Sequence, residues 1–213
     1  MKKYIKILNV LFLGIVMLIA CKKASYLTDK GIHDAKTPLT TYDYLKQHQY
    51  HLFDSLILII DHYNLKEEMN SAGTVFASTD YSIARYIDAK RLRGNFTMDS
   101  LYKYVKADTV RQYFFSDKIK RSNLIDESPR IYTNQGGVVT AVQKQLSDSQ
   151  ADNQWSGAPV YNMWFIKVLD GLDQNATTPL GRSDSRIRCQ TADIETSSGG
   201  ILNVLANTYT FTR

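Results

Sequence analysis

Thr74-Val75-Phe76-Ala77-Ser78-Thr79-Asp80 is the stretch that decides the fold we expect for this chain. Its first half is β-prone, because Val75 and Phe76 favour strands. Its last two residues are typical of a helix start, since an oxygen of Thr79 or Asp80 can accept a hydrogen bond from the first helical turn. Apolar residues then recur at helical spacing to about residue 92. We therefore predict a buried strand that passes directly into a capped helix.

Helical periodicity is also present on both sides of this stretch. From residue 40 or 41 to Tyr63, apolar side chains recur at helical intervals and predict one helix with a broad apolar face. Further along, we expect Thr97 to cap a short helix and Asp108 to cap another that reaches the aromatic run 113–115. The first part of the domain is therefore predicted to be mainly helical.

The period of the sequence changes from about residue 129 onward. Two alternating segments around a glycine-containing turn predict a β-hairpin over 130–142. Strands are also predicted at 160–169, 187–194, 201–205 and 208–211, with polar loops at 147–159 and 171–185. Helices followed by strands predict an α+β domain, with N-terminal helices packed on an antiparallel β-sheet or wedge.

A second motif lies near the C-terminus. Asp193 is followed by a glycine pair, Gly199-Gly200, and by an apolar run that contains Asn203. The two motifs together resemble the two signatures of fasciclin-like (FAS1) domains. In the resemblance, Ser78 stands where the family usually has proline and Asn203 where it usually has histidine. A shift of one residue would instead place the family's Asn-Gly turn at residues 198–199.

The resemblance implies a single FAS1-like domain over residues 41–213. It implies that the first motif and the closing glycine turn lie side by side in one compact wedge. It also implies adhesion or extracellular binding rather than catalysis, which is an analogy at the level of the fold. The residues of the two signatures are then structural, namely Thr74, Phe76, Thr79, Asp80, Asp193, Gly199, Gly200 and Asn203.

The N-terminus is typical of a secretory signal. Residues 1–21 begin with lysines, continue with an apolar stretch from Ile7 to Ala20 and end on Cys21. That apolar stretch is shorter than the roughly 20 residues that a membrane-spanning helix needs. Residues 18–21 resemble a bacterial lipobox, which predicts cleavage before Cys21 and acylation, for example with palmitate, at this cysteine. The alternative is an ordinary signal peptide with a chance cysteine.

The residues after Cys21 indicate in which membrane the protein is anchored. Lys22 and Lys23 follow with no aspartate, which by resemblance to other lipoproteins favours the outer membrane, on its periplasmic or surface face. Several acyl chains anchor a protein durably where one does not. Residues 22–40 have little periodicity, and we interpret them as a flexible tether between the lipid and the domain.

The charge of the chain does not indicate a nucleic-acid partner. The 213 residues carry a net charge of +5, and three of these charges are lysines within residues 1–21. We find no stripe of arginine and lysine in the rest of the chain that would follow a phosphate backbone. Of the two cysteines, Cys189 lies in a predicted strand and is expected to be a small core residue.

The sequence contains few patterns that indicate a catalytic or metal-binding site. It contains no nucleophile elbow, phosphate loop or zinc-binding His-Glu-x-x-His motif, and we expect no catalytic residue, metal or cofactor. His48, His51 and Asp54 stand at helical spacing, which leaves a zinc site open as an alternative to a solvated helix face. Trp155 lies within a polar segment and is a candidate contact for a protein or glycan partner, or else a plug at the end of a sheet.

These observations lead to one main expectation and one alternative. We expect a lipid-anchored adhesion or binding module of a bacterial outer membrane, without catalytic activity. Its partner would be a protein or a polysaccharide of the envelope, contacted by the loops around Trp155 and 171–185. The alternative is an accessory lipoprotein of an outer-membrane system for glycan or nutrient uptake; a hydrolase with an unrecognised site is a weaker one.

Overall fold

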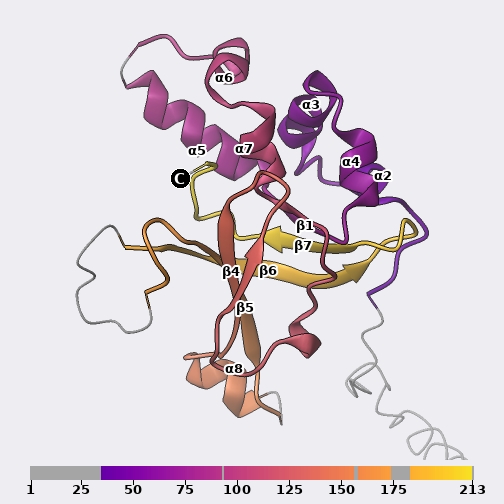
Figure 1. The fold of residues 1–213 in the computed structure, drawn as a ribbon, viewed down its shortest axis with the longest axis vertical. Helices are drawn as coiled ribbons and strands as arrows, with labels where there is room; N and C mark the ends of the chain where they lie inside the picture. Colours follow the sequence, from indigo (N-terminus) through magenta and orange to yellow (C-terminus); the bar gives the residue numbers. More distant parts are fainter. Residues whose placement is uncertain (1–34, 93, 156–157, 174–182, 213) are drawn as a thin grey trace, which may run out of the picture. The chain divides into compact units, whose positions relative to one another are not determined.

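The computed structural model describes residues 35–92, 94–155, 158–173 and 183–212. Residues Ala35–Arg213 form one compact unit, to which all elements named below belong (Figure 1). The predicted signal peptide and Cys21 lie outside the described residues.

Seven strands in the described part of the chain form one sheet in the order β2-β1-β7-β6-β5-β4-β3. All neighbours are antiparallel except β1 and β7, which run parallel. Together with the helices, this makes a mixed helix-and-sheet domain, as the sequence predicts. The strands are β1 (Thr74–Ala77), β2 (Phe114–Phe115), β3 (Arg130–Thr133), β4 (Val139–Leu146), β5 (Tyr161–Lys167), β6 (Ser185–Glu195) and β7 (Ile201–Leu205).

The long strand β6 belongs to both halves of this sheet. Its first residues pair with β5 and its later residues pair with β7, with a bulge between Thr191 and Ile194. A bulge increases the local twist of a strand, so the two halves turn relative to each other here. The ends of the sheet also approach each other, since the Gln135 N–H after β3 donates to the Phe114 carbonyl of β2 at 2.8 Å. The sheet is therefore nearly closed on itself.

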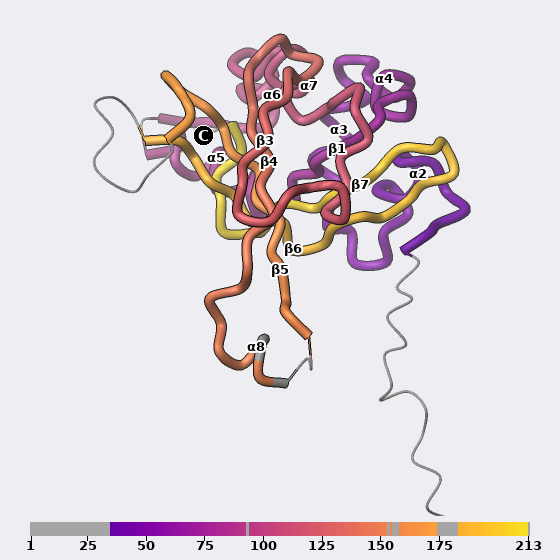
Figure 2. Tube along the Cα trace, turned by 60° about the horizontal axis from the view of Figure 1, so that its bottom comes forward, coloured from indigo at the N-terminus to yellow at the C-terminus, as the bar shows by residue number. Residues whose placement is uncertain are grey.

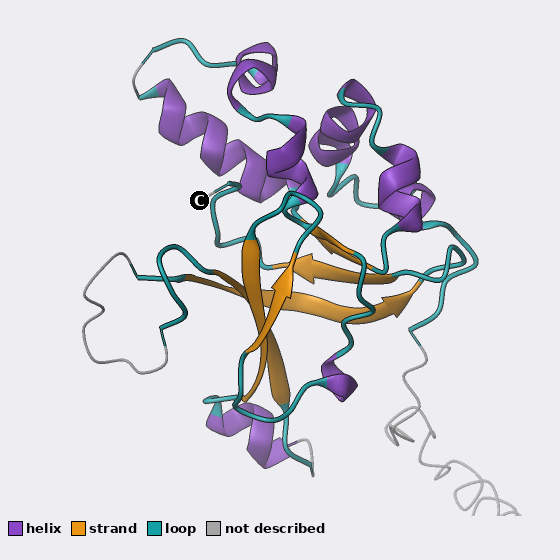
Figure 3. Ribbon diagram, in the orientation of Figure 1, coloured by secondary structure: helices purple, strands orange, loops and turns teal. Residues whose placement is uncertain are grey.

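The helices before the β3–β4 hairpin gather on one side of the sheet, whereas α8 lies at the far end of the β4–β5 connection (Figures 1 and 3). Figure 2 shows the same separation from a second direction. The helices are α2 (Thr41–Lys46), α3 (Asp54–His62), α4 (Lys66–Ser71), α5 (Asp80–Arg91), α6 (Met98–Tyr104), α7 (Ala107–Arg111) and α8 (Gln150–Trp155), with a 3₁₀ turn η2 at Arg121–Asn123.

Several predicted elements are confirmed. Helix α5 ends at Arg91, and Gly94 follows with a φ of +143°, a conformation that favours glycine. Thr97 caps α6, because its side chain accepts a hydrogen bond from the Ser100 N–H. The predicted hairpin is β3 and β4, joined by a turn in which Gly137 has a φ of +75°.

Other predicted elements are wrong. The single helix from residue 41 to Tyr63 is two helices, because His51 adopts a φ of +50° that no helix continues through. Asp108 lies inside α7 rather than at its cap, and the aromatic pair that follows forms strand β2. The predicted loop 147–159 contains α8, and the described residues of 208–211 form no strand.

The last part of the predicted tether belongs to the domain. The Glu195 N–H donates to the Ala35 carbonyl at 2.7 Å, and the Thr37 N–H donates back to the Glu195 carbonyl at 2.9 Å. The Ser197 N–H donates to the Leu39 carbonyl at 2.9 Å. A flexible tether that extends to residue 40 is therefore too long, since residues 35–40 are held against the end of β6.

Aromatic side chains fill the core between the helices and the sheet. Phe76 of β1 packs against Phe165 of β5, with ring centroids 4.9 Å apart, and against Phe115 of β2 at 5.5 Å. Tyr113 stacks between Phe165 and Phe211. These five rings come from four segments of the chain, so the core joins both halves of the sheet to the C-terminal segment.

Candidate functional site

The polar residues of the first motif tie distant segments together instead of capping their own helix. Thr79 occupies the N-cap position of α5, but its hydroxyl donates to Asn207 Oδ1 at 2.8 Å and makes no cap hydrogen bond. Asp80 Oδ1 accepts the Ser55 N–H at 2.8 Å, and burial raises the pKa of this carboxyl. The expected side-chain cap is therefore absent from this helix start.

Thr74 at the start of the first motif has a comparable role. Its buried hydroxyl donates to the Asp117 carbonyl at 2.6 Å and accepts the Ile119 N–H at 2.7 Å. Ser78, where FAS1 domains usually have proline, hydrogen-bonds the hydroxyl of Tyr209. The motif thus fixes the segments after β2 and β7 to β1.

The second motif lies directly beside the first, as predicted. Strand β7 pairs with β1 from Thr74 opposite Ile201 to Ala77 opposite Val204. Asn203 is fully buried in this pair, and its Oδ1 accepts the Asp193 N–H at 2.9 Å. That N–H lies in the β6 bulge, where the strand ladder leaves it without a strand partner.

The Asp193 side chain and the glycine pair complete this corner of the fold. Asp193 has a φ of +67°, and its carboxylate accepts the Arg121 N–H at 2.8 Å. Gly199 takes the left-handed position of the turn, with a φ of +82°. At Gly200, a Cβ atom would lie 2.7 Å from the Ala72 carbonyl oxygen. The signature residues are therefore mainly buried or turn-forming, although Asp193 also lines an open pocket of about 400 Å³ together with Arg121 and Tyr161.

An open groove of about 1030 Å³ lies on the outward side of the sheet. In the middle of β5 and β6, Met163, Phe165, Ile187 and Cys189 are buried in the core, whereas the residues that alternate with them form a largely polar set, namely Asn162, Trp164, Arg186, Arg188 and Gln190. The polar set faces the groove together with the segment after β7. The groove is lined by 147–149, 183–188 and 206–210, and by Asn162, Trp164, Leu169 and Gln190.

Trp164 lies at the centre of a cross-strand row in this face. It pairs in register with Gln143 of β4 on one side and with Arg188 of β6 on the other. The guanidinium of Arg186 lies over the indole, 5.3 Å from the ring centroid. Arg186 also donates to Gln143 Oε1 at 2.6 Å and to Gln145 Oε1 at 3.0 Å. The indole is therefore held flat on the sheet between amides and a cation.

Among the described residues, the Trp164 indole N–H of this face lacks an acceptor and its two arginines lack a carboxylate partner, although Arg186 donates to two amide oxygens. The indole Nε1 of Trp164 is buried and has no hydrogen-bond acceptor there. Arg186 and Arg188, both exposed on the same face two residues apart, form no salt bridge with a described carboxylate. Two like charges at this spacing raise the positive potential beside Trp164, while Asp148 and Asp184 bring negative charge to other parts of the lining.

The opposite wall of the groove is formed by the segment after β7. Asn207 accepts from Gln190 Nε2 at 3.3 Å and from the Thr79 hydroxyl, and Arg85 donates to its backbone carbonyl at 3.1 Å. Burial raises the pKa of the Tyr209 hydroxyl well above its usual value, so the hydroxyl stays protonated. This wall is thus fixed by hydrogen bonds to the first motif.

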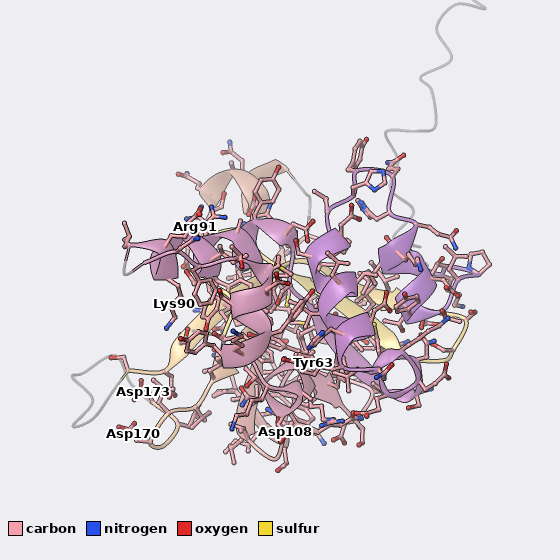
Figure 4. The ribbon with its side chains drawn as sticks, turned by 90° about the horizontal axis from the view of Figure 1, so that it is seen from above. Tyr63, Lys90, Arg91, Asp108, Asp170 and Asp173 are labelled. Carbon is pink, nitrogen blue, oxygen red and sulfur yellow. The ribbon has the colours of Figure 1, made fainter. Side chains whose placement is uncertain are left out.

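A pair of aspartates closes the base of the β5–β6 loop. Asp184 Oδ1 accepts the Leu169 N–H at 3.1 Å, and its Oδ2 accepts the Asp173 N–H at 2.9 Å. Asp173 Oδ2 accepts the Asp184 N–H in return at 2.8 Å. Asp170 and Asp173 are labelled beside this loop in Figure 4. Both oxygens of Asp184 are therefore hydrogen-bonded to neutral backbone groups, and its negative charge remains at the rim of the groove.

The residues singled out by the sequence do not form a second site. Trp155 ends α8, and its side chain lies outside the described part of the chain, as does Cys21. His51 contacts Asp54 with 3.4 Å between Nδ1 and Oδ2, while the His48 ring packs edge-on against Phe53. In the described ranges, no three His, Cys, Asp or Glu side chains come close enough to hold a metal ion.

Cys189 belongs to the core, as expected. It is 8% exposed, and burial raises the pKa of its thiol. Trp164 is the site residue that the sequence analysis missed. A signal for it was present, because Asn162 and Trp164 share one alternate face of β5 while Met163 and Phe165 share the other.

Comparisons with known proteins give no assignment: no protein-family model matches the chain, and no curated protein matches it. Within the described residues, no helix has both the length and the apolar character needed to cross a membrane.

Proposed function

We propose that this chain is a FAS1-like, lipid-anchored binding module of a bacterial outer membrane, which holds a partner of the envelope and catalyses no reaction. The pairing of β1 with β7 supports the FAS1 part, because it brings together the two motifs that resemble the family's signatures. The N-terminal 21 residues support the anchor, since they combine a signal sequence with a lipobox-like end.

The observation that carries the binding role is the groove around Trp164. The Trp164 indole is a large ring held in place on the sheet, with the Arg186 guanidinium over it, and tryptophan and arginine are the residues that dominate binding interfaces. Amides, hydroxyls and two arginines surround it, so hydrogen bonds can orient a partner on this surface. The groove is built on strands and on a hydrogen-bonded wall, which keeps it preformed.

The polar lining also favours the second candidate function. A groove rich in amide and hydroxyl groups, with the aromatic rings of Trp164 and Tyr209, suits a sugar chain, as expected of an accessory lipoprotein in glycan or nutrient uptake. The genes beside the one for this chain separate the two functions. A transporter and a sugar-binding lipoprotein next to it favour uptake, and their absence favours adhesion.

The anchor is tested by metabolic labelling. The full chain is expressed in a Gram-negative bacterium with radiolabelled palmitate, beside Cys21→Ser and the matched control Cys189→Ala. We expect label on the wild type and on Cys189→Ala, in the outer-membrane fraction, and none on Cys21→Ser. Label that is absent from the wild type, or that persists in Cys21→Ser, contradicts the anchor.

The binding role is tested with the same full chain, purified in detergent. Its retention on sedimented envelope fragments is compared with that of Trp164→Ala and of Tyr50→Ala, an exposed aromatic of the helical region that does not line the groove. We expect the wild type and Tyr50→Ala to sediment with the fragments and Trp164→Ala to stay in solution. Equal retention of all three overturns the binding role of the groove.

A further inference from the structure

The chemistry of the groove narrows the class of ligand that fits it. Its lining mixes apolar side chains with amides, hydroxyls and charged groups; the apolar ones are Trp164, Leu169, Ile187, Ala206 and Tyr209. Planar amides at Asn162, Gln190 and Asn207 match the hydroxyl groups of a sugar ring, which donate and accept at once. A volume of about 1030 Å³ leaves room for several rings. These features favour an oligosaccharide over a peptide.

The two arginines favour a ligand that carries negative charge. Arg188 is exposed beside Trp164 in the same cross-strand row, and Arg186 covers the indole. A guanidinium binds a carboxylate through two parallel hydrogen bonds, which neutral sugars cannot provide. The described lining also contains two carboxylates, Asp148 and Asp184, and both oxygens of Asp184 accept backbone N–H groups instead of an arginine.

The surroundings of Trp164 indicate that a ligand would displace the Arg186 side chain. The indole N–H is buried without an acceptor among the described residues, and the guanidinium lies over the ring. A carboxylate that draws Arg186 toward itself opens the ring face to a sugar and brings an oxygen near the indole N–H. Charge recognition and ring stacking are thus coupled at one point of the groove.

From these contacts we infer that the groove binds a carboxylate-bearing polysaccharide, that is, a chain of uronic-acid-type sugars. This inference rests on the proposed binding function and specifies its ligand. Arg188 and Arg186 hold the carboxylates, Trp164 stacks on one sugar ring, and Gln190 and Asn207 bind hydroxyl groups.

The test is a calorimetric titration of the full chain in detergent. The probes are hexamers of galacturonic acid and of mannuronic acid, methyl-esterified forms of the same hexamers, and dextran sulfate. The esters keep the sugar rings and remove the charge. The variants are Arg188→Gln and Trp164→Phe, with Arg130→Gln as the matched control, an exposed arginine of β3 outside the groove.

We expect at least one acidic hexamer to bind, and its affinity to fall about tenfold or more in Arg188→Gln, since a charge-assisted hydrogen bond is lost. The ester should bind at least about tenfold more weakly than the acid for the same reason. Trp164→Phe should weaken binding while Arg130→Gln leaves it unchanged, and added salt should weaken it in all forms.

Several outcomes overturn the inference. These are no binding of either acidic hexamer, equal binding of acid and ester, an affinity that Arg188→Gln leaves unchanged, or tighter binding of dextran sulfate than of both carboxylated probes. If the chain still sediments with envelope fragments in any of these cases, only the ligand assignment fails. If it no longer does so, the proposed binding function fails as well.

Discussion

Single polar residues at buried positions hold the two sequence motifs together. Asn203 is the clearest case, because one side chain serves two segments at the point where β6 bulges. Its oxygen accepts the Asp193 N–H, and its Nδ2 donates to the Ile119 carbonyl at 3.5 Å. The side chain thus replaces strand hydrogen bonds that the bulge removes.

Asn203→Ala should be strongly destabilising. It leaves a buried backbone N–H and a buried carbonyl without partners, at a cost of about 2–4 kcal/mol in the free energy of unfolding. Urea unfolding followed by circular dichroism measures this change. The control Asn123→Ala removes an exposed asparagine and should stay within about 0.5 kcal/mol of the wild type. Equal losses for both variants would contradict this role of Asn203.

The glycine pair offers a second comparison at the scale of one residue. Gly200→Ala brings a methyl group against the Ala72 carbonyl, where a Cβ would be only 2.7 Å away, and should cost about 1–3 kcal/mol through overpacking. At Gly199→Ala, the new Cβ would make only an ordinary contact with Lys118 Nζ at 3.8 Å, but the residue adopts a φ of +82°, which costs about 1 kcal/mol. Thermal melts of both variants should rank Gly200→Ala as the less stable. The reverse order would mean that β1 and β7 separate easily at this corner.

Residue types predicted the buried motifs that hold the fold together better than they predicted the groove around Trp164. The buried motifs could be recognised because Thr74, Asp193 and the glycines are needed at particular backbone positions. Trp155 drew attention because polar residues surround it, whereas Trp164 lies inside a strand that is apolar on its other face. Which face of that strand is open depends on where the helices pack, and no local pattern contains this information.

At the scale of elements, an ion pair fixes α4 to α7 across the helical layer. Arg111 donates through Nε to Glu68 Oε2 at 2.6 Å and through Nη2 to Glu68 Oε1 at 2.8 Å. Its Nη1 donates to Asp108 at 2.8 Å. Figure 4 shows the helical layer from above, with Asp108 labelled. The hydrogen bonds from Arg111 lower the pKa of the Glu68 carboxyl below its usual value.

Glu68→Gln should therefore destabilise the protein in a pH-dependent way. A lowered pKa in the folded state means that the stabilisation is present above the unfolded pKa and is lost as the pH falls through the folded pKa. Near neutral pH we expect a loss of about 1 kcal/mol, because the pair is partly exposed and screened. Urea melts from pH 7 down to pH 3 should show the two proteins converging. Glu67→Gln on the same helix is the control, and an unchanged gap at pH 3 would contradict the assignment.

Elements with a strong local signal were predicted well, and those set by tertiary pairing were not. The cap at Thr97 and the glycine turn of the hairpin follow from local backbone needs. Strand β2 was read as helix, since two aromatic residues fit either period and only pairing with β1 decides between them. The break at His51 was also missed, because apolar spacing continues across it while the backbone turns.

At the scale of the whole molecule, the strand order makes the last strand essential to the first. Strand β7 lies between β1 and β6, so it joins the half that carries the helices to the half that carries the groove. Its segment also supplies Phe211, which stacks on Tyr113 in the core. The predicted wedge was correct in placing the two motifs together, but the parallel pairing of β1 with β7 could not be read from strand lengths.

Removal of residues 201–213 should therefore unfold the entire domain, and not only its end. Strand β1 keeps only the two-residue pairing with β2, and five buried residues of β7 leave the sheet. We expect the truncated chain to lose its cooperative thermal transition and to be cleaved throughout by a dilute protease. A variant that lacks only residues 212–213 is the control. Survival of a protected fragment that includes residues 41–115 would contradict this expectation.

The same strand order delays the pairing of the first strand during synthesis. Thr74 cannot pair with Ile201 until residue 201 has left the ribosome, so before that point β1 can pair only with the two residues of β2. For the exported protein that we propose, such a delay keeps the chain extended, as a threading translocase requires.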